Sequence, residues 1–164
     1  MEQKKEMQQD MENYIKKTLL PESYLLQKGI ISKMNPTFFS CDAENRCLTL
    51  QFEVQEWQLN PEGILHGGMI VTAFDTVFGL LCHCYMQQNM INTIDISTTF
   101  LKPIPANCKY NITAKANHVG NTITSMTAEA HLCEDNLLLA TASSTFMKLR
   151  TKTDDMPYYS KPIK

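Results

Sequence analysis

The sequence predicts an α+β domain in which an antiparallel sheet of five or six strands wraps around one long buried helix. The helix is predicted at Gly67–Met86, where Ala, Leu, Met and Phe leave almost no polar face. Strand-length segments lie on both sides of it, two before and four after, at residues 37–42, 46–54, 91–101, 108–119, 121–133 and 137–149. This order is typical of one sheet packed on one helix.

In the strand segments, apolar and polar residues alternate, as expected for a sheet with one face exposed to solvent. Leu48, Leu50, Phe52 and Val54 alternate with polar residues. The later segments are separated by Gly120-Asn121 and Asp135-Asn136, which suit tight antiparallel turns because residues tolerant of positive φ are needed there. The sheet is therefore predicted to be antiparallel.

The N-terminal residues are predicted to be helical. Glu2–Leu20 is rich in Glu, Gln, Lys and Met, Pro21 closes this helix, and a second short helix runs through Lys28 with Gly29 as its C-terminal cap. These helices either pack on the domain or at an interface, or form a frayed surface segment. The predicted organisation is a helical extension, a single domain and a loose tail, at residues 1–30, 31–150 and 151–164.

Length and charge exclude several classes of protein. The 164 residues suit one domain, and 43% apolar with 20% charged residues is an ordinary globular composition. A net charge of −2 gives no basic surface for DNA or RNA. The N-terminus lacks the apolar core of a signal peptide, so a cytoplasmic location is expected. Because the most apolar stretch contains Asp75 and His83, it is expected to be buried in protein and not in a membrane.

The six cysteines are expected to be reduced thiols, since no export signal accompanies them. Cys82 and Cys84 flank His83 and resemble a metal cluster at first sight. Positions i and i+2 of a helix do not face each other, however, so no metal site is predicted there.

The chemistry is predicted to lie at the start of the buried helix. Gly67 and Gly68 have no side chains, so a ligand can approach their backbone closely, and the first amides of a helix have no internal acceptor. Backed by the helix dipole, these N–H groups can hold a carbonyl oxygen on which negative charge builds. Asp75 lies farther along the same apolar helix, where it either reaches solvent, pairs with a Lys or acts in catalysis.

These residues resemble the hot-dog thioesterases, in the branch typified by the phenylacetate-degradation (PaaI-like) acyl-CoA thioesterases. The resemblance covers residues 37–150 and rests on the pattern Asn-x-x-Gly-x-x-His-Gly-Gly followed by Asp, ungapped from Asn60 to Asp75. The segment from Thr93 to Pro103 matches a strand of the family that also ends in Pro. The resemblance implies a hot-dog fold and hydrolysis of a small to medium acyl-CoA, with no cofactor, because coenzyme A is part of the substrate.

The resemblance also implies roles for individual residues. Asp75 matches the catalytic carboxylate, as general base or nucleophile, and the Gly67 amide matches the group that polarises the thioester carbonyl. Thr93 stands where relatives often carry a Ser that positions water. The resemblance places four further residues around substrate or water, with His66 alternatively satisfying backbone groups of the loop: Asn60, His66, Gly63 and Gly68.

The family joins two subunits, so that each site draws on both chains. The resemblance therefore implies a homodimer at minimum, with a tetramer as the expected assembly, in which Asp75 of one chain faces the Gly67 amide of the other. Two other functions stay open: a non-catalytic acyl-CoA binder or sensor, and a hydratase or dehydratase. The acyl group, and the choice between coenzyme A and acyl carrier protein, are left open by the sequence.

Overall fold

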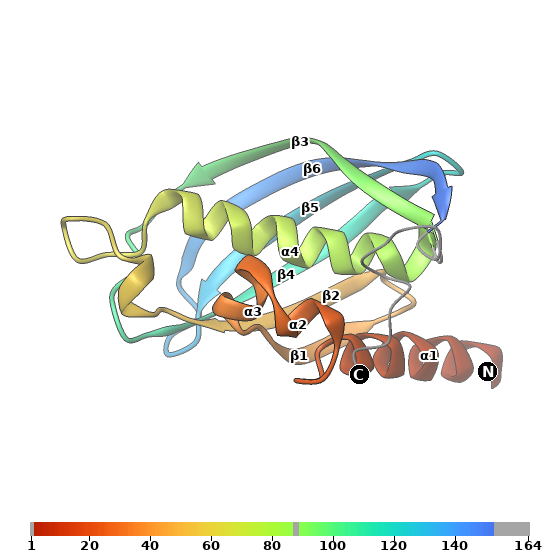
Figure 1. The fold of residues 1–164 in the computed structure, drawn as a ribbon, viewed down its shortest axis with the longest axis horizontal. Helices are drawn as coiled ribbons and strands as arrows, with labels where there is room; N and C mark the ends of the chain where they lie inside the picture. Colours follow the sequence, from red (N-terminus) through yellow and green to blue (C-terminus); the bar gives the residue numbers. More distant parts are fainter. Residues whose placement is uncertain (1, 87–88, 153–164) are drawn as a thin grey trace.

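The computed structural model describes residues 2–86 and 89–152. Its six strands pair antiparallel in one sheet, which wraps around a long helix (Figure 1). The helix is α4 (Gly67–Met86), and the strand order in the sheet is β1-β2-β4-β5-β6-β3. The strands are β1 (Thr37–Asp42), β2 (Cys47–Glu53), β3 (Asn89–Phe100), β4 (Lys109–Val119), β5 (Ile123–Leu132) and β6 (Leu138–Lys152). The predicted α+β class and hot-dog architecture are confirmed.

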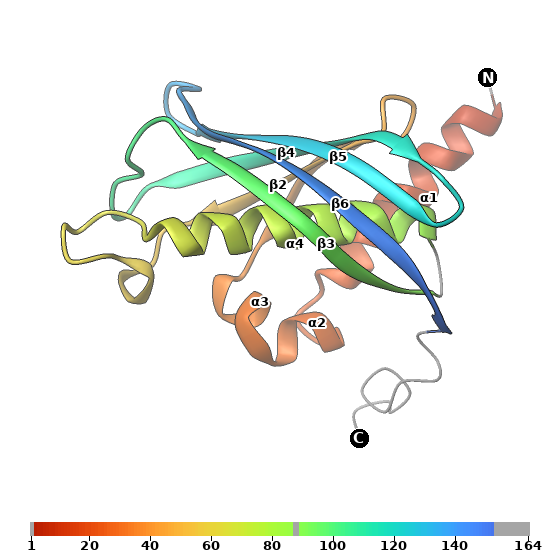
Figure 2. The same cartoon turned by 90° about the horizontal axis from the view of Figure 1, so that it is seen from above.

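The core lies between α4 and the concave face of the sheet, as the turned view shows (Figure 2). One side of α4 is buried at the spacing of a helix face, at Ile70, Phe74, Val77 and Leu81. By length and composition α4 could also cross a membrane, but it is packed against five of the strands and supplies much of the core. Burial against the sheet therefore accounts for its apolar sequence.

Strand β3 forms one edge of the sheet. It pairs with β6 on one side, and within the described residues no strand pairs with its other side. The register shifts between Thr93 and Asp95, which leaves Ile94 without a partner in β6 and 53% exposed. Such a bulge changes which face of the sheet the following side chains occupy.

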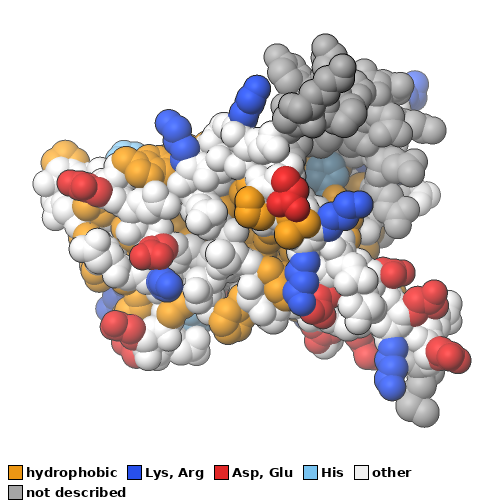
Figure 3. All heavy atoms as spheres, turned by 60° about the horizontal axis from the view of Figure 1, so that its bottom comes forward, with side chains coloured by type: hydrophobic (Ala, Val, Ile, Leu, Met, Phe, Trp, Pro, Cys, Tyr) orange, Lys and Arg blue, Asp and Glu red, His pale blue; other side chains and the backbone are white. Residues whose placement is uncertain are grey.

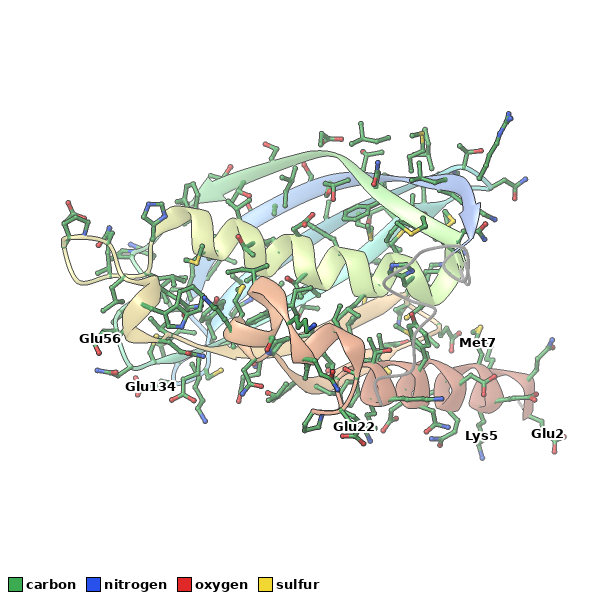
Figure 4. The ribbon with its side chains drawn as sticks, viewed as in Figure 1. Glu2, Lys5, Met7, Glu22, Glu56 and Glu134 are labelled. Carbon is green, nitrogen blue, oxygen red and sulfur yellow. The ribbon has the colours of Figure 1, made fainter. Side chains whose placement is uncertain are left out.

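The N-terminal helices pack on the domain: α1 (Glu2–Thr18), α2 (Tyr24–Gln27) and α3 (Gly29–Met34). Met11 and Ile15, one turn apart on α1, are buried. The side chain of Gln8 ties α1 to the β1–β2 turn, because its amide donates to the Cys41 carbonyl at 2.9 Å and accepts from the Ala43 N–H at 2.8 Å. The opposite side of α1 carries charges, and Glu2 and Lys5 point away from the domain (Figure 4).

The structure corrects the boundaries of the short helices. Gly29 does not cap α2, which ends at Gln27 before the extended Lys28; with φ of 85°, Gly29 begins α3 instead. That helix ends at Asn35, whose φ is 47° and whose N–H donates to the Ile31 carbonyl at 2.9 Å. Asn tolerates this left-handed conformation, so Asn35 caps α3, and the cap predicted for the preceding helix at Gly29 is wrong.

The structure agrees only in part with the predicted hairpin turns and tail. Asn136 has a φ of 60°, as expected for its turn. Gly120 and Asn121 have no positive φ, contrary to the prediction, and the Gly120 N–H closes their turn by donating to the Ile123 carbonyl. Strand β6 continues to Lys152, and the rest of the predicted loose tail lies outside the described residues.

The surface agrees with the nearly neutral charge. Figure 3 shows acidic and basic side chains scattered together over the face in view, with much white and apolar surface between them. All six cysteines are free thiols, in agreement with the expectation that they are reduced.

The docking of α1 predicts a stability effect. Ile15 is fully buried, so Ile15→Ala is expected to lower the free energy of unfolding by about 2–4 kcal/mol, from lost transfer energy and the cavity left behind. Lys17 is exposed and lies two residues further along α1, so it offers a control: Lys17→Ala should change the free energy of unfolding by less than about 0.5 kcal/mol. Urea unfolding measures both, and equal effects would mean that α1 does not pack on the domain.

Candidate active site

The segment before α4 forms a tight turn that fixes where the helix begins. Asn60 and Ile64 approach across the turn, with the Asn60 N–H donating to the Ile64 carbonyl at 2.8 Å. The side-chain oxygen of Asn60 accepts from the N–H groups of Glu62 and Ile64 at 3.1 and 3.2 Å. Gly63 lies in this turn with a φ of 76°, which disfavours other residues. Asn60 and Gly63 therefore build the turn.

His66 caps the first turn of α4. Its ring Nδ1 accepts the Gly68 N–H at 2.9 Å, and its carbonyl accepts the Met69 N–H at 2.8 Å. A Cβ on Gly68 would lie 3.2 Å from Nδ1, so the absence of a side chain there lets the ring approach. The second interpretation of His66 therefore holds for its Nδ1, which accepts a backbone N–H. The rest of the side chain is exposed.

The Gly67 N–H is left available by this cap. Among the described residues it has no hydrogen-bond acceptor, because Gly67 is the first residue of the helix and His66 takes the next amide. A cavity of about 340 Å³ lies beside it and is lined by Phe100, among others. The Phe100 ring is 56% exposed and would lie 3.5 Å from a Cβ on Gly67. The first free amide of α4 thus opens onto a cavity with an aromatic wall.

Asp75 and Thr93 form the second part of the site. The Thr93 hydroxyl donates to Asp75 Oδ1 at 2.9 Å, across from α4 to β3. The bulge at Ile94 lies directly beside Thr93, which pairs in register with the buried Phe146 on the helix side of the sheet. Asp75 is half-buried, on the side of α4 that faces the edge strand. The structure therefore brings together the two residues predicted as base and water-positioning hydroxyl.

The two parts of the site are too far apart to act together within one chain. Asp75 follows Gly67 by eight positions on the same helix, which at 1.5 Å per residue is a rise of about 12 Å. A carboxylate and an amide that act on one carbonyl group must lie within a few ångströms of it. Within one chain, the Asp75 carboxylate and the Gly67 amide therefore lie too far apart to contact the same carbonyl group.

The cysteine thiols and His83 do not belong to the candidate active site. Desolvation is the largest cause of a raised pKa at each of the six cysteines, and it brings that of Cys84 to about 12. Burial also lowers the pKa of His83, two turns beyond Asp75. A nucleophilic cysteine needs a lowered pKa, so none of these thiols is suited to attack a thioester at neutral pH.

Sequence reasoning missed two residues of the cavity beside Gly67, Phe100 and Lys102. Both belong to the segment that matched the family strand ending in Pro103, but nothing in their spacing links them to residue 67. The contact arises because the end of β3 returns to the start of α4, which only the fold shows.

The turn geometry predicts how Asn60 responds to substitution. Asn60→Ala removes an acceptor used by two backbone N–H groups and is expected to lower the free energy of unfolding by about 1–2 kcal/mol. Asn60→Asp keeps an oxygen in the same place and should retain most of the stability. Urea unfolding of the pair measures this. A loss in Asn60→Asp as large as in Asn60→Ala would contradict the role of the oxygen.

Comparison with known proteins gives a family match for the central part of the chain. The model of the thioesterase superfamily matches residues 62–139. A Salmonella typhimurium protein, medium/long-chain acyl-CoA thioesterase YigI, is 29% identical over 100 residues; the match covers 52% of this chain and 63% of that relative's length.

Solved structures share the fold. PaaI of the E. coli phenylacetic acid degradation operon superposes with a TM-score of 0.74 at 16% identity, over 89% of this chain and 98% of PaaI. A Streptococcus mutans protein solved with bound acetyl-CoA gives 0.62 at 22% identity, over 71% and 91% of the two chains. These structures confirm the hot-dog fold, and residues 62–139 of this chain match the model of the thioesterase superfamily.

Proposed function

We propose that this protein hydrolyses the thioester bond of small to medium acyl-CoA substrates. The observation that carries the proposal is the pairing of Asp75 with the Thr93 hydroxyl, on the half-buried side of a helix whose first amide has no acceptor among the described residues. The family match and the acyl-CoA thioesterase from Salmonella support the reaction type. The acetyl-CoA bound to the Streptococcus protein supports coenzyme A as the carrier.

The Gly67 amide activates the thioester carbonyl group for attack. Its N–H is oriented by the helix and backed by the positive end of the helix dipole. When the carbonyl oxygen of the thioester accepts this N–H, the negative charge that develops on that oxygen is stabilised. His66 holds the start of the helix in place through its hydrogen bond to Gly68, so it acts as a positioning residue.

Asp75 acts either as the general base or as the nucleophile. Thr93 donates to Oδ1, which orients the carboxylate and leaves Oδ2 for the reaction. As general base, Oδ2 takes a proton from water while the water oxygen bonds to the carbonyl carbon; the C–S bond then breaks, the sulfur takes that proton from Asp75 and leaves as the thiol of coenzyme A, and the acyl group is released as the acid. As nucleophile, Oδ2 bonds to that carbon and expels the thiolate, and water hydrolyses the resulting anhydride.

A composite site between two subunits follows from the rise of the helix. Because Asp75 and Gly67 of one chain are about 12 Å apart along α4, the Asp75 of one subunit works with the Gly67 amide of its partner. The open edge of β3, with Ile94 exposed, offers a place where a second copy can pair through the same edge. The proposed assembly is a dimer at minimum and a tetramer as its larger form, which light scattering measures.

Asp75→Asn tests the proposed reaction. The change keeps size and polarity but removes the basic oxygen, so turnover should fall by about 10²–10⁴-fold, and by more if Asp75 is the nucleophile. Binding of substrate should persist, because the Gly67 amide and the apolar surroundings are unchanged. Thiol release from a panel of acyl-CoA substrates measures turnover, and calorimetry measures binding.

The matched control is Asp10→Asn, which removes an exposed carboxylate of α1 and should leave turnover unchanged. Tight acyl-CoA binding without hydrolysis in the unmodified protein, and unaltered binding in Asp75→Asn, would show a non-catalytic acyl-CoA binder instead.

A further inference from the structure

The short helices α2 and α3, with the end of α1 that leads into them, form a lobe on the domain. Figure 2 shows α2 and α3 projecting on the side away from the sheet. We call residues 16–34 the helical lobe. Its two short helices pack chiefly on each other. Leu25 packs against the core and Met34 is buried, so these two side chains attach the lobe and leave its other side facing outward.

The helical lobe exposes apolar side chains. Leu20 and Ile30 are each 42% exposed, and Leu26 and Ile31 are half-buried. Exposed apolar residues that occur singly are ordinary on a protein surface, whereas a group of them on one projecting element indicates a contact site. The lobe therefore offers an apolar surface to a partner outside its own chain.

The helical lobe is also basic, although the whole chain is acidic. Its four lysines and single glutamate give it a charge of +3, so the remaining residues carry −5 of a net charge of −2. Lys17, Lys28 and Lys33 are exposed, and none of them forms an ion pair within residues 2–86 and 89–152. Unpaired positive charge beside exposed apolar side chains is complementary to a surface that is anionic outside and apolar beneath.

We propose that the helical lobe binds the surface of membranes that contain anionic phospholipids. Leu20 and Ile30 enter the boundary between headgroups and acyl chains, while the three exposed lysines contact the anionic headgroups. Helices α2 and α3 have 4 and 6 residues, which is too short to span a bilayer, so the contact is peripheral. The inference does not depend on the proposed thioesterase function.

A second copy of the chain is a less suitable partner for the helical lobe. In a two-fold contact the same surface meets itself, so the lysines of one lobe would lie against those of the other. Like charges brought together in this way weaken a contact. An anionic lipid surface attracts the lysines and accepts the apolar side chains at the same time.

Co-sedimentation of the full chain with vesicles tests the inference, using phosphatidylcholine alone and equal parts of phosphatidylcholine and phosphatidylserine. We expect at least about 10-fold tighter binding to the mixed vesicles, and weaker binding as salt is added. Lys33→Gln should weaken binding by about 5-fold, because one lysine fewer contacts the anionic surface. Ile30→Ser should weaken it by about 10-fold, because its apolar side chain no longer enters the bilayer boundary.

The matched controls are Lys115→Gln on β4 and Leu137→Ser in the turn before β6, whose side chain is also 42% exposed. Neither control should change vesicle binding, and thermal midpoints verify that all four variants are folded. Absence of vesicle binding, equal binding to both kinds of vesicle, or equal losses in variants and controls would overturn the inference. So would a smaller assembly of Ile30→Ser in light scattering with vesicle binding unchanged, which would assign the lobe to contact between subunits.

Discussion

The burial of α4 against the sheet is the interaction on which the rest of the structure depends. Ile70, Phe74, Val77 and Leu81 enter the core from one side of the helix and orient it relative to the strands. Once that side is fixed, the opposite positions can face only the edge strand or a second subunit. Asp75 lies on that side of the helix, so the packing of the core also decides where the proposed chemistry takes place.

The same helix explains why one chain is insufficient for the reaction proposed here. A helix gives its first amide and a residue two turns later fixed positions about 12 Å apart, and no side-chain rotation removes that separation. The open edge of β3 beside Asp75 offers a place where a second copy of the chain can pair. The α4 of that copy would place its first amide near the Asp75 carboxylate. Oligomerisation and catalysis are thus linked by geometry in this account.

The hydrophobic pattern predicted the helix with its observed bounds, Gly67–Met86, because burial on most sides leaves a strong signal in sequence. Strand ends differ from the predicted ones by up to three residues, since turn hydrogen bonds and not side-chain pattern decide them. The cap at Asn35 was missed because Gly29 has the stronger local signal. The approach of Phe100 to Gly67 and the bulge beside Thr93 depend on contacts between distant segments, which no local pattern contains.

A mixed-subunit experiment tests the composite site most directly. Asp75→Asn removes the carboxylate, and Gly67→Val places methyl groups beside the amide that opens onto the Phe100 cavity. Each variant alone should be inactive. When the two are co-expressed and assemble at random, half of the dimers are hybrids with one intact site, so about a quarter of the wild-type thioesterase activity should return. Activity no higher than that of the separate variants, despite hybrid dimers in the preparation, would contradict a site shared between two chains.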